Sequence, residues 1–286
     1  MKSSAPIPLR GYPLPLTSRC RTDKLVSRDV RKAALSHIPQ TPTTLPLILL
    51  RTRDTDTNIR KLVYTSILSS SSDPDTPYAS SLVGHPRSLT IAQRELVVRN
   101  GLGDREAVVK SACEGLIGGW VDVVREKENN AGANKGEVVN DVIAFLKLFD
   151  LADPESKIGE DALLSVFKTR VDIFDALEFG DAYWASLTPE RAFLARVFVS
   201  YCITTKDNTR LEDALPVVTA LAFRIQSAYN ALLEDMHSPG GDEDEEKEDE
   251  RLDRESVIAE MLRLAVDLDY ADEIGRRKMF QLVRKS

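Results

Sequence analysis

The chain has 286 residues with a net charge of −7, and 42% of them are hydrophobic and 6% aromatic. This hydrophobic content excludes a wholly disordered chain. No apolar run approaches the ~18–20 residues of a membrane helix. No Asn-Gly or Asp-Gly pair stands between alternating runs as a hairpin turn, so we expect an all-α protein. Three widely spaced cysteines, Cys20, Cys113 and Cys202, indicate a reducing compartment rather than a disulfide framework.

The net charge conceals two opposite segments. Residues 234–250 contain ten acidic residues against the single Lys247, whereas residues 19–61 contain ten Arg and Lys residues against four Asp residues. Local charges of about −9 and +6 follow. The acidic overall balance therefore says little about binding partners, and the basic segment says more.

The N-terminal part of the chain predicts a leader and then three helices. Residues 1–22 contain no acidic residue and four prolines, and we expect a disordered leader. Helices are expected at 27–38, 43–53 and 57–68, with Asn58 as the N-cap of the third.

A Ser- and Pro-rich stretch at 69–88 is expected to be a loop inserted into the array. Helices at 89–100 and 104–124 follow, joined by a turn at Gly101 and Gly103. Leu89, Ala92, Leu96 and Val97 are expected to form the inner stripe of the first of these helices.

The C-terminal half predicts further helices at 137–149, 159–178, 187–203 and 211–233. Like charges at high density repel one another, so the stretch 237–250 is expected to be a disordered acidic linker. Residues 251–286 are then expected to be one more, truncated repeat, in which a helix at 254–268 pairs with the helix that follows it.

A repeated pattern connects these segments. Asp54 stands five residues before Ile59-Arg60, and Asp104 stands five residues before Val109-Lys110. Val30-Arg31 opens a third copy, and Asp269 with Ile274 is a partial fourth. An Asp in a turn, a β-branched residue, a cation and then an apolar helix are typical of a HEAT repeat, which buries its apolar face only by stacking on its neighbours. The fold expected for residues 23–236 is an all-α HEAT-repeat solenoid of antiparallel helix pairs, an armadillo-like superhelix of about five repeats.

Three blocks carry a resemblance to a known family. They are HIPQTPTTLPLILLRTRDTDTNIRKLVY, QRELVVRNGLGDREAVVKSA and LRLAVDLDYADEIGRRKMFQLVR. In wording, order and spacing they resemble the condensin subunit 3 family of HEAT-repeat proteins, also called the chromosome-associated protein G family. The family's members are roughly three times longer, so the resemblance implies a central fragment that starts with an unrelated leader and stops within a repeat.

The resemblance implies a non-catalytic role and no cofactor. Family members bind a segment of the kleisin subunit, and the pair holds double-stranded DNA in the condensin ring during mitotic chromosome condensation. The ATPase belongs to the SMC subunits, which this chain would reach only indirectly. The implied location is the nucleus and the chromosome, with a cytoplasmic pool, and no membrane is involved. From the repeats alone, a generic HEAT scaffold or adaptor that binds only protein remains the alternative.

Phosphate contacts need long cationic side chains spaced along one face. The candidates for DNA binding are Arg28, Lys32, Arg51, Arg53, Lys61, Arg94, Arg99 and Arg105. A different role is expected for Arg31, Arg60 and Lys110, because they occupy the repeat position whose cation pairs with an Asp such as Asp54 or Asp104.

Nothing in the sequence indicates a catalytic or metal site. His37, His85 and His237 lack metal-ligand spacing, and the phosphate-loop and nucleophile motifs are absent. Asp172 and Asp175 near Phe174 and Trp184 would suit base excision only if a carboxylate were buried next to an aromatic cleft, and a solvated helix edge is the expected reading.

Overall fold

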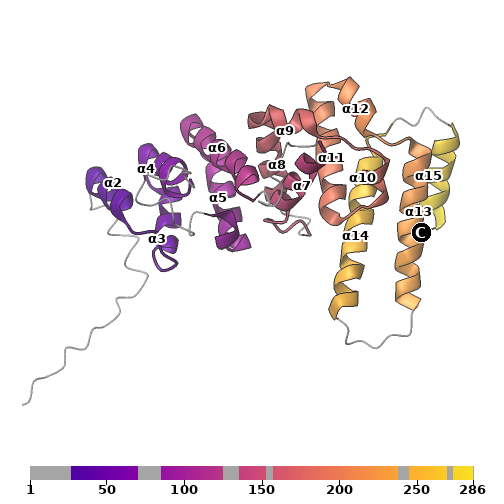
Figure 1. Cartoon of the computed structure of the whole chain (residues 1–286), viewed down its shortest axis with the longest axis horizontal. Coiled ribbons are helices and arrows are strands. Elements are labelled where there is room, and N and C mark those ends of the chain that lie inside the picture. The colour runs from indigo at the N-terminus through magenta and orange to yellow at the C-terminus, as the bar shows by residue number, and fades with distance from the viewer. Residues whose placement is uncertain are drawn as a thin grey trace, which may run out of the picture.

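The computed structural model describes residues 27–69, 85–124, 135–152, 157–237, 245–268 and 273–285. Every regular element in these ranges is a helix, as the sequence predicted. The helices stand side by side in an elongated row, from α2 at one end to α13 and α15 at the other (Figure 1). The proposed leader at 1–22 lies outside the described residues, as does most of the insertion at 69–88.

The first helices follow the predicted ranges closely. They are α2 (Arg28–His37), α3 (Leu45–Leu50) with the 3-10 turn η2 (Arg51–Arg53), and α4 (Thr57–Leu62), which continues as the π-helical turn η3 (Val63–Ile67). The N-cap of α4 is Asp56 and not Asn58, because the Asp56 carboxylate accepts hydrogen bonds from the amides of Asn58 and Ile59. A carboxylate there also complements the positive end of the helix dipole.

The second unit consists of α5 (Ile91–Leu102) and α6 (Ala107–Val124), preceded by the 3-10 turn η5 (Pro86–Ser88). Thr90 and Gln93 form a reciprocal capping box that fixes the start of α5. The two helices approach closely at Gly101, where an added Cβ would lie 2.2 Å from the Cys113 sulfur. Cys113 and Cys202 are both buried as free thiols.

The middle of the array is less regular than predicted. It contains α7 (Lys135–Leu146), α8 (Ile158–Thr169), α9 (Val171–Ala176) and α10 (Asp181–Ala185). The single helix expected at 159–178 is wrong, because the backbone leaves the helical region at Arg170 (φ −120°, ψ 68°). The Arg170 guanidinium there binds the carbonyl of Gly118 and the carboxylates of Asp122 and Asp172.

The helix expected at 211–233 is also broken. After α11 (Pro189–Thr205), the chain forms α12 (Asn208–Ala214) and then α13 (Val218–His237). Leu215 adopts an extended conformation. The proline that follows it explains the break, because Pro216 disfavours a helical conformation in the residue before it.

The last helices, α14 (Glu245–Ala265) and α15 (Glu273–Lys285), correct the predicted linker and terminal repeat. Residues 245–250 are helical, because acidic side chains suit a helix N-terminus and Arg251 and Arg254 pair with Glu248 and Glu250 one turn away.

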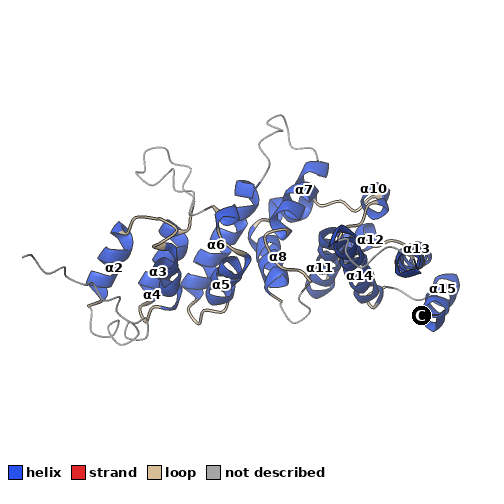
Figure 2. Ribbon diagram, turned by 90° about the horizontal axis from the view of Figure 1, so that it is seen from below, coloured by secondary structure: helices blue, strands red, loops and turns tan. Residues whose placement is uncertain are grey.

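The terminal helices also pair differently from the prediction. Helix α14 packs between α11 and α13, whereas α15 packs against α13 and not chiefly against α14 (Figure 2). The acidic segment therefore lies between two helices that pack against each other, α13 and α14.

Candidate functional site

Two arginines in equivalent repeat positions form a ladder between neighbouring units. Arg31 of α2 donates two hydrogen bonds to the Asp54 carboxylate, at 2.9 and 3.0 Å. Arg60 of α4 does the same to Asp104 of the next unit, at 2.6 and 3.0 Å. Each cation pairs with the Asp of the following repeat, which confirms the predicted structural role of Arg31 and Arg60.

The ladder carboxylates are kept charged by their partners. Burial by itself would raise the pKa of Asp54, but hydrogen bonds from Arg31, the Asp56 amide and Arg51 outweigh it and lower that pKa. The hydrogen bond from Arg60 lowers the pKa of Asp104 against the opposing effect of burial. The same bond raises the pKa of Arg60. Because the side chains of Asp54 and Asp104 are only 2% and 6% exposed, the ladder is an interior feature.

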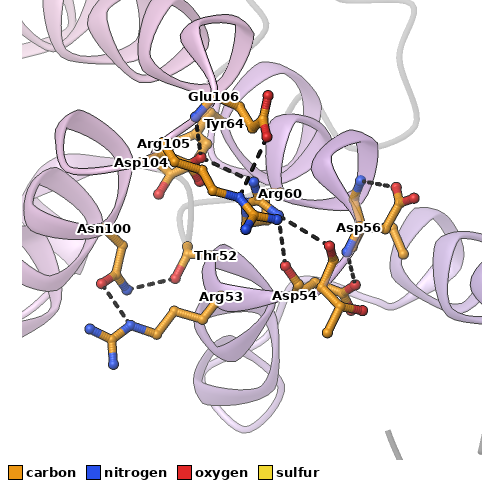
Figure 3. A network of polar contacts seen from close by, with 12 residues as sticks. Thr52, Arg53, Asp54, Asp56, Arg60, Tyr64, Asn100, Asp104, Arg105 and Glu106 are labelled. Carbon is orange, nitrogen blue, oxygen red and sulfur yellow. Dashed lines mark hydrogen bonds and ion pairs between the residues drawn. The ribbon is translucent and has the colours of Figure 1, made fainter. Parts of the chain in front are cut away.

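Exposed cations surround this ladder on the edge formed by the start of α2, the α3–α4 turn and the α5–α6 turn, which we call the turn edge (Figure 3). Arg53 donates to Asn100 across the two turns at 3.0 Å, and Asn100 donates to Thr52 at 2.8 Å. Arg28 pairs with Asp56 at 3.0 Å and remains half exposed. Arg105 is 78% exposed beside Glu106.

The predicted DNA-binding residues thus fall into groups. Arg28, Arg53 and Arg105 project from the turn edge, where they contact Asp56, Asn100 and Glu106. Lys32, Lys61 and Arg99 are exposed, and no ion pair of theirs is found among the described residues. Arg51 is different because it pairs with the buried Asp54 at 3.2 Å and so supports the ladder.

Arg94 is a correction to the predicted interface. Its side chain is 7% exposed and turned inward, where it donates to the carbonyls of Pro86, Leu89 and Leu148. It therefore fastens η5 and the turn after α7 to α5 and is not presented to phosphates. A signal was available: Arg94, Val97, Val98 and Gly101 are spaced as one helix face, and that face is the buried one.

The ion pair predicted for Lys110 is not found among the described residues, where its side chain is exposed. Asp153, which stands five residues before Ile158 in the next unit, lies outside those residues, so the described part of the ladder ends at Arg60 and Asp104. Lys110 instead lines a groove along α8 together with Arg99 and Lys168, the last of which the sequence did not single out.

The helix edge at Asp172 is solvated, as the sequence predicts. Asp172 is 64% exposed, and the hydrogen bond from Arg170 lowers the pKa of its carboxyl. The described side chains bring no three metal-ligating residues together. Within the same ranges, no helix is both long and apolar enough to span a bilayer.

No family model matches the chain. Condensin complex subunit 3 of Schizosaccharomyces pombe is 31% identical over 261 residues, which are 91% of this chain and 25% of that protein. Its namesake in Saccharomyces cerevisiae is 28% identical over 90% of this chain and 22% of the relative. A crystal structure of the S. pombe condensin Cnd3–Cnd2 subcomplex matches with a TM-score of 0.71 and 29% identity, over 91% of this chain and 29% of that one.

The chain belongs to the condensin subunit 3 family. It spans about a quarter of the length of the relatives it matches. The comparison with the Cnd3–Cnd2 structure also identifies the fold as the HEAT-repeat solenoid expected from the sequence.

Proposed function

We propose that the chain is part of a non-catalytic condensin HEAT subunit that binds the kleisin subunit and, with it, double-stranded DNA in chromosome condensation. Nuclear and chromosomal location follows from this role, as does an indirect link to the SMC ATPase subunits. The observation that supports kleisin binding is the match to a subunit crystallised with Cnd2 over 91% of this chain.

The turn edge supports the DNA part of the proposal. Arg28, Arg53 and Arg105 extend from it, with Lys61 one residue beyond the ladder arginine of α4. Stacking of the repeats requires the buried pairs but not these exposed cations. Long cations on one edge, without stacked aromatic rings between them, suit phosphates of a duplex rather than bases of a single strand.

The test is a titration of a labelled DNA duplex with the chain bound to its own kleisin, the Cnd2 homologue of the same genome. The triple variant Arg53→Glu, Lys61→Glu and Arg105→Glu should weaken DNA affinity by about tenfold or more at low salt, because three phosphate contacts become repulsive. Arg51 is left unchanged, because a carboxylate there would face Asp54.

Lys147→Glu is the matched control, since Lys147 is an exposed lysine at the end of α7, away from the turn edge. It should leave DNA affinity within about twofold of the original. Far-ultraviolet circular dichroism should be unchanged in both proteins. If the kleisin complex forms but binds no duplex even at low salt, the alternative of a protein-binding HEAT scaffold replaces the DNA role.

A further inference from the structure

A groove of about 760 Å³ runs along α8, between the α5–α6 turn on one side and the end of α11 on the other. Its apolar lining includes Leu102, Leu164 and Tyr201, all of which are partly exposed although they pack against the core. The ring of Tyr201 is fixed by contacts with Phe167 and Phe174, at centroid distances of 5.6 and 5.1 Å. The groove is therefore a formed depression with a rigid apolar wall.

Ser165 of α8 also lines the groove but offers it no polar contact. The residue is only 5% exposed, and its hydroxyl oxygen is closed off from the surface. The polar contacts that the groove can make therefore come from the charged side chains around it.

The charges around the groove are unequal. Lys168 pairs with Glu114 at 2.6 Å, which neutralises both. Arg99 and Lys110 also line the groove, and neither has an ion pair among the described residues. Asp161 is the other acid of the lining, at the start of α8. The wall formed by α5 and α6 thus offers two cations to an incoming carboxylate.

We propose that this groove binds a short extended peptide segment in which an apolar side chain, seated between Leu164 and Tyr201, lies next to a carboxylate facing Arg99 and Lys110. Resting on the proposed function, we assign this segment to the kleisin. A DNA duplex is a poorer occupant, because its charged phosphates would lose bound water against the apolar wall and gain no favourable contact in return. A peptide satisfies the apolar wall and the cations together.

The test uses the full chain in complex with its own kleisin. A photo-reactive benzoyl-phenylalanine replaces Thr204, which is exposed at the groove rim, and in a control protein it replaces Lys147. Illumination should crosslink only the Thr204 protein to the kleisin. Digestion and mass spectrometry should identify a kleisin peptide with an apolar residue beside an acidic one.

Two substitutions test the same site by affinity. Thr204→Trp fills the groove from its rim and should weaken kleisin binding by about tenfold or more. Lys110→Glu should weaken it by about two- to fivefold, the range of an exposed ion pair. Lys147→Glu should have no effect on this affinity.

The outcomes separate the two proposals. If the original chain does not bind kleisin at all, the proposed function fails. If kleisin binds with unchanged affinity to the Thr204→Trp protein and no crosslink forms at position 204, the groove assignment fails while the proposed function stands. If position 204 crosslinks to added duplex DNA instead, the groove belongs to the DNA path and the peptide assignment is overturned.

Discussion

Arg60 and Arg94 are both buried arginines, but the protein neutralises them in different ways. Arg60 forms a bidentate ion pair with Asp104 and also donates to the carbonyl of Asp54 at 2.9 Å. Arg94 faces three backbone carbonyls and has no carboxylate partner in its hydrogen bonds, so burial lowers its pKa. The first arginine joins two repeats, and the second ties a connecting turn to its helix.

Replacing Arg60 with Met should lower the free energy of unfolding by about 3–5 kcal/mol, because Asp104 would be left as an uncompensated buried charge. The measurement is urea unfolding followed by circular dichroism. The double variant Arg60→Met, Asp104→Leu should lose less than the sum of the two single variants. Strict additivity of the two losses would contradict direct coupling of the pair.

The pH dependence of stability should follow the ladder carboxylates. Asp54 and Asp104 have folded-state pKa values below the ordinary 3.8. Their contribution is therefore complete above the unfolded pKa and is lost as the pH falls through the folded pKa. The free energy of unfolding should begin to fall below about pH 5 and continue downward. Asp104→Asn should flatten this decline, and an unchanged profile would show that other carboxylates cause it.

How far the sequence predicts the site depends on the kind of partner. The partners of Arg31 and Arg60 follow a repeated spacing, so both pairs could be predicted. The burial of Arg94 could be inferred from its place on the apolar face of α5, but its partners are carbonyls at positions 86, 89 and 148, which no local pattern connects. The partner of Lys110 at the same spacing would be Asp153, which lies outside the described residues, so that pair stays a prediction. The groove lining could not be predicted from a local pattern either, because its residues come from four helices that are far apart in the sequence.

At the scale of the helix, glycines show where neighbouring elements touch. Gly101→Ala should destabilise the protein by about 1–3 kcal/mol, because the new methyl group would overlap the Cys113 side chain at 2.2 Å. Gly119→Ala in α6 is the matched control, since nothing lies within 4 Å of its Cβ position. It should be neutral or stabilising by up to about 1 kcal/mol. Equal effects of the two substitutions in thermal unfolding would contradict the close approach of α5 and α6.

Arg196 connects three helices in the C-terminal half. From α11 it donates to Glu260 of α14 and, at 3.1 Å, to Glu160 of α8. The Glu260 side chain is 8% exposed, and Arg263 also pairs with it at 2.5 Å. This junction holds helix α14 against α11.

Glu260→Gln should destabilise the protein by about 1.5–3 kcal/mol, since it weakens charge-assisted hydrogen bonds away from water. Hydrogen exchange should accelerate in α14 more than in α5. Glu255→Gln is the control because Glu255 is half exposed and lies 3.8 Å from Arg251. Its effect should remain within about 0–1 kcal/mol. Uniform acceleration along the whole array after Glu260→Gln would contradict a local junction.

Most of the longer helices were predictable from their apolar positions and their capping residues, whereas the short helix α10 was not predicted. The breaks at Arg170 and Leu215 were not predicted, although Pro216 was a visible cause of the second. Pairing was less predictable still, because α13 has a buried face toward α14 and another toward α15. From its order in the sequence, α15 was expected to pair with α14, but it packs against α13.

At the scale of the whole molecule, charge is arranged along the array. The turn edge, with its exposed arginines, lies in the part formed by α2 to α6, whereas the described acidic side chains Glu248, Asp249 and Glu250 are exposed at the start of α14 (Figure 1). The two regions lie in different parts of the row. A polyanion should therefore approach the end of the molecule that carries the turn edge.

This polarity makes the salt dependence of DNA binding a quantitative test. Each phosphate contact contributes about 0.9 to the slope of log affinity against log salt concentration. Neutralising Arg53, Lys61 and Arg105 to Gln one after another should reduce the slope by about 0.9 at each step, with affinity falling uniformly across duplex sequences. Lys147→Gln should leave the slope unchanged. If the three substitutions lower affinity while the slope stays constant, these side chains do not contact phosphates, and the DNA path must follow another face of the array.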